Sequence, residues 1–466
     1  MRRLGVVLVL LLLLALAACG GEKQAPRPVA APKAPPGPPP KPRPRPSWIR
    51  VVVLDGDLSK RVRGARVTVA GHRAVTSRKG VARILLPHRG RLVTMVAKRG
   101  YDSLRRRVRF VNRPLVVVRV FRKNLQWTMY GASPGRTQFQ PYIRIRPPFR
   151  LIWSRPVGAL MEFPAVVDDE VAFVSNRRGL VRAYSMRTGA TVWRRYTHAT
   201  MAASPAIFED ELVVHGEDGH VWVLDRYNGR VLWRYTTGSP IESSPLVVDG
   251  VDYFGDWGGT VYALDLRTHR LRWTYRSGYK ITSSASLAKG TIFIGDYGGR
   301  LLALSARSGG LRWSASVNGR IYGTPAVANG RVFVPSSTGN SLTAFSTRGS
   351  RLWSLNTGAY VYGSPAVWNG RVYIGSYTGV FYCLSARSGA TIWRYSSGAA
   401  IGGAGTVVGG IAYFANRHHR IYGLNARTGR RVFGWPDGAF VPVSGNGRRL
   451  LLHGFSRLYA FEPRRR

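Results

Sequence analysis

The stretch Gly259-Thr260-Val261-Tyr262-Ala263-Leu264-Asp265 decides the fold, because close variants of it return along the chain at one fixed interval. It precedes Trp273, and Gly-Val-Phe-Tyr-Cys-Leu-Ser at 379–385 precedes Trp393 in the same way. A fixed period of this length is typical of repeat proteins. Tryptophan recurs at a spacing of 40 residues, and phenylalanine holds the next place: Trp153, Trp193, Trp233, Trp273, Trp313, Trp353, Trp393 and Phe433.

Each repeat contains four short runs suited to β-strands. In one unit these runs are Pro245–Val248, Val251–Gly255, Thr260–Asp265 and Leu271–Tyr275, separated by turns rich in Gly and Asp. Short strands joined by tight turns predict an antiparallel meander. A four-stranded unit of about 40 residues has the size of a propeller blade.

The series of strands predicts eight blades. The fourth-strand series begins at Leu151–Ser154, before any first strand, and ends at Arg431–Phe433. The last blade must therefore combine three C-terminal strands with the one around Trp153. Such a split blade closes the ring and leaves no free sheet edge. The sequence predicts an all-β protein whose residues 123–466 form an eight-bladed β-propeller with four-stranded blades.

The repeated phrase resembles the PQQ-like (quinoprotein-type) β-propeller repeat. Asp265, Thr188, Gly189 and Trp193, with their periodic counterparts, match the consensus of that repeat, and 127–137 resembles its usual lead-in. The resemblance implies the propeller fold. It does not by itself imply a function, because functions reside in sites that differ among proteins of one fold. A tryptophan present in every blade is expected to pack between blades rather than to bind a ligand.

The N-terminus has the features of an exported lipoprotein. Arg2 and Arg3 precede an apolar run at 4–18, which is typical of a secretory signal. The ending Leu-Ala-Ala-Cys resembles the bacterial lipobox, which implies a signal peptide at 1–18 and a lipidated Cys19; an ordinary signal peptide is the alternative. Proline and basic residues dominate the linker at 19–47 and predict an extended spacer.

Residues 48–122 are expected to form a separate small β-sandwich. Six runs in this stretch suit β-strands, and its pattern of Gly, Val and Gly100-Tyr101 resembles carboxypeptidase-regulatory-like domains. Ser77 and Arg78 stand where that family often has Asp. The resemblance implies a spacer or adhesion module, and no catalytic pattern is visible here.

The charge of the chain is strongly positive. Its formal net charge is +48, and residues 48–122 alone hold 20 Lys and Arg against 3 Asp and Glu. Such a surface attracts polyanions. No nucleic-acid motif is present, and an exported protein is more suited to anionic lipid headgroups or wall polymers. The alternative is solvated charge that reflects codon use, since Arg outnumbers Lys 61 to 9.

One rim of the propeller is the candidate ligand site. Loops that join fourth to first strands and second to third strands lie on the same rim of a meander, so their residues gather there. Acids beside aromatics in a concave rim suit a peptide or cationic ligand. The alternative is that these are ordinary turn residues. The candidate residues are Glu162, Glu242, Asp256, Trp257, Asp296, Tyr297, Tyr322, Tyr362 and Tyr377.

The sequence is compatible with three classes of function: an enzyme, a sensor or polymer binder, and a scaffold. The resemblance allows a PQQ-dependent dehydrogenase, but such enzymes carry an adjacent cysteine pair, whereas Cys19 and Cys383 are the only cysteines here. We therefore expect no enzyme activity, and no catalytic, cofactor-binding or metal-binding residues. An extracytoplasmic sensor or binder of anionic wall polymers is a further alternative.

The preferred interpretation combines the propeller with the lipobox. Together they resemble BamB-type lipoproteins, which implies a monomeric, lipid-anchored scaffold on the outer side of the cell membrane, either periplasmic or on the cell surface. Its expected partners are envelope proteins or anionic envelope polymers, not nucleic acid. The basic small domain and the proline-rich linker depart from that family.

Overall fold

The computed structural model describes residues 46–88, 90–110, 115–438 and 440–464. These residues are almost entirely β-structure, and their one helical element is the 3₁₀ turn η1 (Lys123–Leu125), which confirms the predicted all-β class. In this described part, no helix is long and apolar enough to cross a bilayer. The predicted signal peptide, Cys19 and most of the linker lie outside the described residues.

The N-terminal strands form two sheets. One sheet has the order β4-β1-β7, and the other has the order β3-β2-β5-β6. Alternate residues of both sheets point into a shared core that includes Val51, Val67, Ile84 and Val118. The strand at 72–75 was not among the six expected runs, since it is short and mostly exposed. The strands are β1 (Ser47–Asp55), β2 (Arg66–Val69), β3 (His72–Val75), β4 (Val81–Leu86), β5 (Gly90–Ala97), β6 (Leu104–Phe110) and β7 (Leu115–Val120).

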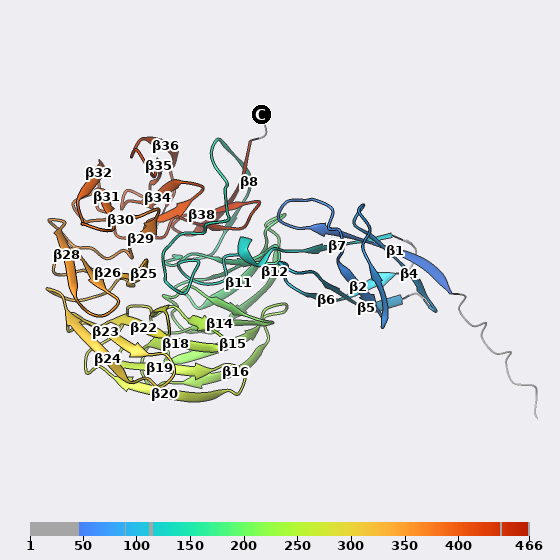
Figure 1. The fold of residues 1–466 in the computed structure, drawn as a ribbon, viewed down its shortest axis with the longest axis horizontal. Helices are drawn as coiled ribbons and strands as arrows, with labels where there is room; N and C mark the ends of the chain where they lie inside the picture. Colours follow the sequence, from blue (N-terminus) through green and yellow to red (C-terminus); the bar gives the residue numbers. More distant parts are fainter. Residues whose placement is uncertain (1–45, 89, 111–114, 439, 465–466) are drawn as a thin grey trace, which may run out of the picture. The chain divides into compact units, whose positions relative to one another are not determined.

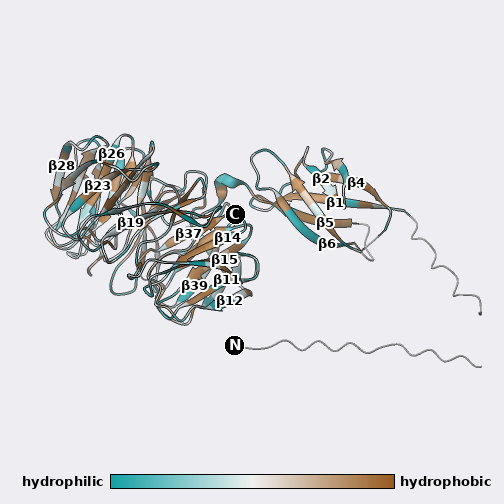
Figure 2. Ribbon diagram, turned by 90° about the horizontal axis from the view of Figure 1, so that it is seen from below, coloured by the Kyte–Doolittle hydropathy of each residue, from teal (hydrophilic) through white to brown (hydrophobic). Residues whose placement is uncertain are grey.

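The remaining strands form eight four-stranded antiparallel sheets, which follow one another around a common centre (Figure 1). Figure 2 shows that hydrophobic residues are concentrated in the strands. The first four sheets are β9 (Val166–Asp168), β10 (Val171–Ser175), β11 (Leu180–Ser185) and β12 (Thr191–Tyr196); β13 (Ala206–Phe208), β14 (Glu211–His215), β15 (His220–Asp225) and β16 (Val231–Thr236); β17 (Leu246–Val248), β18 (Val251–Gly255), β19 (Thr260–Asp265) and β20 (Arg270–Arg276); β21 (Ser286–Ala288), β22 (Thr291–Gly295), β23 (Arg300–Ser305) and β24 (Leu311–Ser316).

The next three sheets continue the same order, and the last sheet takes one strand from much earlier in the chain. There β8 pairs with β39, as the early start of the fourth-strand series predicted. These sheets are β25 (Ala326–Ala328), β26 (Arg331–Ser336), β27 (Ser341–Ser346) and β28 (Arg351–Asn356); β29 (Ala366–Trp368), β30 (Arg371–Gly375), β31 (Val380–Ser385) and β32 (Thr391–Ser396); β33 (Thr406–Val408), β34 (Ile411–Ala415), β35 (Ile421–Asn425) and β36 (Arg431–Trp435); β37 (Val443–Gly445), β38 (Leu450–His453), β39 (Arg457–Pro463) and β8 (Phe149–Pro156).

The periodic tryptophans hold neighbouring sheets together. The indole of Trp153 donates a hydrogen bond to the backbone carbonyl of Met186 in the next sheet, at 2.8 Å. Trp193 repeats this contact with Arg226 at 2.8 Å, and Trp273 repeats it with Ala306 at 3.0 Å. The expected packing role of the tryptophans is therefore confirmed. A buried indole must satisfy its N–H, and this carbonyl does so in six of the seven cases.

The same contact explains why the turn between the third and fourth strands of most sheets contains a glycine. A Cβ placed on Gly229 would lie 2.4 Å from the Trp193 ring, and one on Gly309 would lie 2.6 Å from the Trp273 ring. Both glycines also have positive φ angles. The one departure is His269, whose ring packs on Trp233 at a centroid distance of 4.4 Å. The indole N–H of Trp233 is correspondingly left without a partner.

The Ser-Pro and Thr-Pro pairs of the repeat form a second link between sheets. The hydroxyl of Ser244 accepts a hydrogen bond from the backbone N–H of Ser204, at 3.0 Å. Ser284 accepts from Ser244 at 2.8 Å, and Ser364 accepts from Thr324 at 2.9 Å. Each bond joins residues 40 positions apart. The repeat thus places a row of hydroxyl groups along the inner strands.

The lead-in segment, residues 127–138, binds the first strands of most sheets. Its backbone carbonyls accept hydrogen bonds from the N–H of one residue in each of β9, β13, β21, β25, β29 and β33, at 2.7–2.9 Å, and at β9 the bond is returned. At β17 the side chain of Arg136 replaces the backbone and donates to the carbonyl of Pro245 at 2.8 Å. Arg136 is fully buried and also donates to the carbonyl of Ala285 at 2.9 Å.

Replacement of Gly309 by alanine tests the tryptophan packing. Gly309 has a φ of 73°, and Gly398, with a φ of 76°, has nothing within 4 Å of an added Cβ. Both Gly→Ala changes incur about 1 kcal/mol of left-handed strain. Only Gly309→Ala adds overpacking, which costs about 1–3 kcal/mol more. We expect urea unfolding to show the larger loss for Gly309→Ala, and equal losses would contradict the packing requirement.

Candidate functional site

The predicted rim residues lie between consecutive strands on one side of the sheets. Glu162 lies between β8 and β9, Glu242 between β16 and β17, and Tyr322 and Tyr362 occupy the same place two and three sheets further on. Trp257, Tyr297 and Tyr377 follow the second strands of their sheets. Turns of these two kinds lie at the same edge of a meander, so side chains distant in the sequence meet here.

Five of the predicted residues line one cavity of about 150 Å³. They are Glu162, Glu242, Tyr322, Tyr362 and Tyr377. The lead-in segment contributes Tyr130 to the wall, and the hydroxyl of Tyr130 donates a hydrogen bond to Ser364 at 2.9 Å. Phe163 packs edge-on against Tyr130, at a centroid distance of 5.2 Å. The segment that binds the inner strands therefore also shapes this cavity.

Tyrosines from neighbouring sheets form a continuous row of rings along the rim. The ring centroids of Tyr297 and Tyr322 are 4.6 Å apart, and those of Tyr322 and Tyr362 are 5.0 Å apart. Tyr362 lies 5.0 Å from Tyr377, and Tyr360 packs edge-on against Tyr362 at 5.8 Å. These distances are those of favourable aromatic pairs. We call these five residues the tyrosine row; Tyr360 was not predicted.

Basic side chains of the protein itself cover several of the aromatic faces. The ammonium of Lys280 lies 3.2 Å from the ring centroid of Trp257. Arg320 lies 5.6 Å from the centroid of Tyr297, and Arg417 donates a hydrogen bond to the hydroxyl of Tyr377 at 3.1 Å. The distances of Lys280 and Arg320 from the ring centroids are within the cation–π range. Trp257 is thus engaged internally, which argues against an exogenous cation on that face.

An acidic cluster lies next to the aromatic rings. Arg177 pairs with Glu162 at 3.0 Å and with Glu217 at 3.2 Å. The carboxylate of Glu242 accepts a hydrogen bond from the indole of Trp257, at 3.1 Å. Burial raises the pKa of the Glu242 carboxyl; the hydrogen bond from Trp257 opposes this shift, and the negative charge of Glu162 adds to it. Arg177 pairs with two of these glutamates, whereas Glu242 has no salt bridge among the described residues.

Four predicted rim residues do not line the cavity: Trp257 and Tyr297, which pack beside it, and the two aspartates Asp256 and Asp296. Asp256 and Asp296 are buried and accept hydrogen bonds within their own turns, from the backbone N–H of Thr260 at 2.9 Å and of Arg300 at 3.0 Å. Asp256 also accepts from the hydroxyl of Tyr262 at 2.9 Å. These two carboxylates thus cap their own turns, as the alternative of ordinary turn residues would have them do.

The other groupings of reactive side chains have structural partners. Ser444 lies 3.3 Å from the Nε2 of His453, but both are buried, and burial lowers the pKa of His453 to about 3. Its Nδ1 faces the carbonyl of Val441, so no carboxylate orients the ring. In the cluster Asp102, Asp168 and Asp169, the nitrogens of Arg226 lie 2.5 Å from Asp168 and 2.5 Å from Asp169, and Lys123 lies 4.0 Å from Asp102.

Comparison with known proteins identifies relatives of the repeat region. A family model described as outer membrane protein assembly factor BamB matches residues 126–287, 258–363 and 340–458. Among solved structures, BamB from Moraxella catarrhalis is 17% identical with a TM-score of 0.58, over 69% of this chain and 99% of its own. A search of curated proteins found no match.

Quinoprotein enzymes share the fold as well. The quinohemoprotein alcohol dehydrogenase from Comamonas testosteroni is 13% identical with a TM-score of 0.63, over 73% of this chain and 81% of its own. A europium-containing methanol dehydrogenase is also 13% identical, with a TM-score of 0.62, over 73% and 98%. At such identities the likeness establishes a β-propeller fold and no more.

Replacement of Glu242 by glutamine tests the electrostatics of the site. An acid whose pKa is raised by folding binds its proton more tightly in the folded state, so stability is lost as pH rises through the folded pKa. Glu242→Gln removes this cost. We expect its melting temperature to exceed that of the wild type by about 1–2 °C at pH 7 and to equal it near pH 4.

Thermal unfolding followed by circular dichroism measures both conditions. Glu209→Gln is the control, since the side chain of Glu209 is 66% exposed. It is expected to give no increase at either pH. An unchanged melting temperature for Glu242→Gln at pH 7 would contradict the assignment of a destabilising buried carboxylate.

Proposed function

Because the chain belongs to the family described as outer membrane protein assembly factor BamB, we propose that it is a non-catalytic scaffold that binds protein partners at the cell envelope. The eight four-stranded sheets would form the eight blades of a closed propeller, with β8 completing the last blade. A closed propeller with its inner strands tied to the lead-in segment would present a rigid rim. Rigidity lowers the entropic cost of binding.

The tyrosine row is the observation that carries this proposal. Three consecutive sheets contribute rings to it, and all five tyrosines belong to the connections between strands rather than to the strands that stabilise the sheets. Tyrosine and arginine are enriched where proteins recognise one another, since they combine apolar area with hydrogen-bonding groups. The glutamates beside the row would favour a partner segment that carries basic residues.

The anchoring part of the proposal rests on the N-terminal sequence. A lipidated Cys19 followed by the proline-rich linker would hold the folded part near a membrane surface on its outer side, periplasmic or at the cell surface. The scaffold would act as a monomer.

A PQQ-dependent dehydrogenase is the second candidate, since quinoprotein enzymes share the fold. The cavity lined by Tyr322 and Tyr362 is small for that cofactor. Its volume of about 150 Å³ lies below the roughly 300–1,000 Å³ usual for small-molecule sites. A Cβ on Gly403 would lie 1.5 Å from the carbonyl oxygen of Phe440, so the backbone itself narrows the cavity. These features support the scaffold proposal.

Site-specific photo-cross-linking tests the proposed rim. We expect Tyr362→p-benzoylphenylalanine to cross-link a discrete envelope protein in intact cells, and the yield to fall at least fivefold when Tyr322→Ala is added. The matched control is Tyr196→p-benzoylphenylalanine, because Tyr196 is 51% exposed on the outer strand β12. The same product from Tyr196, or none from Tyr362, would refute a protein-binding rim.

A further inference from the structure

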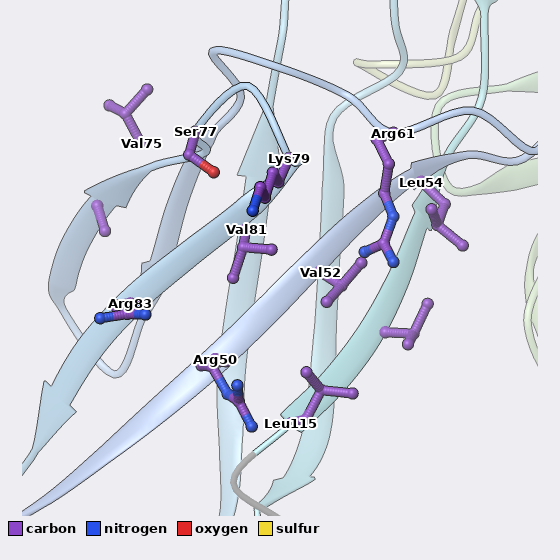
Figure 3. A pocket seen from close by; sticks show the side chains of 12 residues that line it. Arg50, Val52, Leu54, Arg61, Val75, Ser77, Lys79, Val81, Arg83 and Leu115 are labelled. Atoms are coloured by element: carbon purple, nitrogen blue, oxygen red, sulfur yellow. The ribbon is translucent and has the colours of Figure 1, made fainter.

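The outer face of the N-terminal sheet β4-β1-β7 carries a row of arginines over an apolar floor. This face contains a hollow of about 720 Å³, with Val52 and Val81 in its floor. Figure 3 shows Arg50, Arg61, Lys79 and Arg83 around these valines. No acidic residue lines the hollow, within the described part of the chain. We call this surface the cationic face.

Two arginines of the cationic face oppose each other directly. Arg50 on β1 and Arg83 on β4 are cross-strand partners in an antiparallel pair. Like charges in this arrangement destabilise a sheet. Neither guanidinium makes a hydrogen bond or ion pair with any described residue. The sheet therefore holds two positive charges side by side without a partner among the described residues. An anion bound between them would reduce their mutual repulsion.

Large hydrophobic side chains share this face with the arginines. Val52 is flanked by Val81 on β4 and Val117 on β7. Trp48, which is 62% exposed, stands two residues before Arg50 and opposite Leu85. Tryptophan and arginine together are typical of surfaces at the membrane–water interface, where the ring enters the headgroup region and the guanidinium meets lipid phosphates.

We propose that the cationic face docks on a membrane surface rich in anionic phospholipid. Charge complementarity and the apolar floor both favour this occupant. A soluble polyanion would use the arginines but not the exposed Trp48 and Val117. The preceding linker of the chain itself is excluded by charge, since 22–46 contains six Lys and Arg and one Glu. The docking would hold the N-terminal sheets at the bilayer independently of any partner bound at the rim.

Vesicle sedimentation with residues 46–466, which form one compact unit, tests the proposal without a lipid anchor. The probes are vesicles of phosphatidylcholine alone and of phosphatidylcholine with 30 mol% phosphatidylglycerol. We expect binding to the anionic vesicles only. Each arginine near such a surface contributes about fivefold, so Arg50→Gln with Arg83→Gln should weaken partitioning about 30-fold.

The matched control is Arg105→Gln with Arg107→Gln, which removes the same charge from exposed positions on β6 of the other sheet. It should change partitioning less than threefold. An equal loss from both pairs would overturn the cationic face and indicate unspecific attraction. Binding to soluble polyphosphate with no binding to anionic vesicles would overturn the membrane as the occupant. Unchanged melting temperatures confirm that all variants are folded.

Discussion

The hydrogen bonds between the lead-in segment and the inner strands are the constraint on which the rest of the structure depends. A single stretch of backbone meets six first strands in turn, and the buried guanidinium of Arg136 supplies the contact where the backbone does not. Burial lowers the pKa of Arg136 to about 10, so it remains charged at neutral pH, and backbone carbonyls rather than a carboxylate solvate it. Because Tyr130 of the same segment lines the central cavity, the element that unites the sheets also shapes the site.

One group at the rim opposes the stability of the fold. Glu242 is partly buried beside Glu162, and its ionisation is disfavoured there. Beside it, five tyrosines pack against one another in the connections between strands. A group that lowers the free energy of unfolding is expected at a binding site, where selection acts on binding as well as on stability. The opposed arginines of the N-terminal sheet show the same pattern at a second surface, which suggests that the chain has two separate places for partners of different chemistry.

Much of the fold could be predicted from the sequence, because the 40-residue period gives the positions of the strands and turns. It also predicts that Trp193 and its counterparts pack between sheets. The period also placed Tyr322 and Tyr362 at one edge. The period also put Arg177 at the repeat position of Trp257, but not its pairing with Glu162 and Glu217. Lys280 and Tyr360 were not predicted, since contacts across the rim depend on side-chain conformations rather than on spacing. Asp256 and Asp296 were assigned to the rim because an aspartate that caps its own turn and one that faces a ligand look alike in sequence. The role of Arg136 also required the structure, as an isolated arginine in a loop gives no sign of burial.

The most direct test of the scaffold account is a titration of residues 46–466 with PQQ and calcium, followed by desalting, absorbance spectroscopy and thermal unfolding. The account predicts no cofactor retained after desalting and no change in melting temperature, because the cavity of about 150 Å³ is narrowed by Phe440 and walled by tyrosines. Retention of one equivalent of PQQ with a raised melting temperature would contradict it and would identify the chain as a quinoprotein.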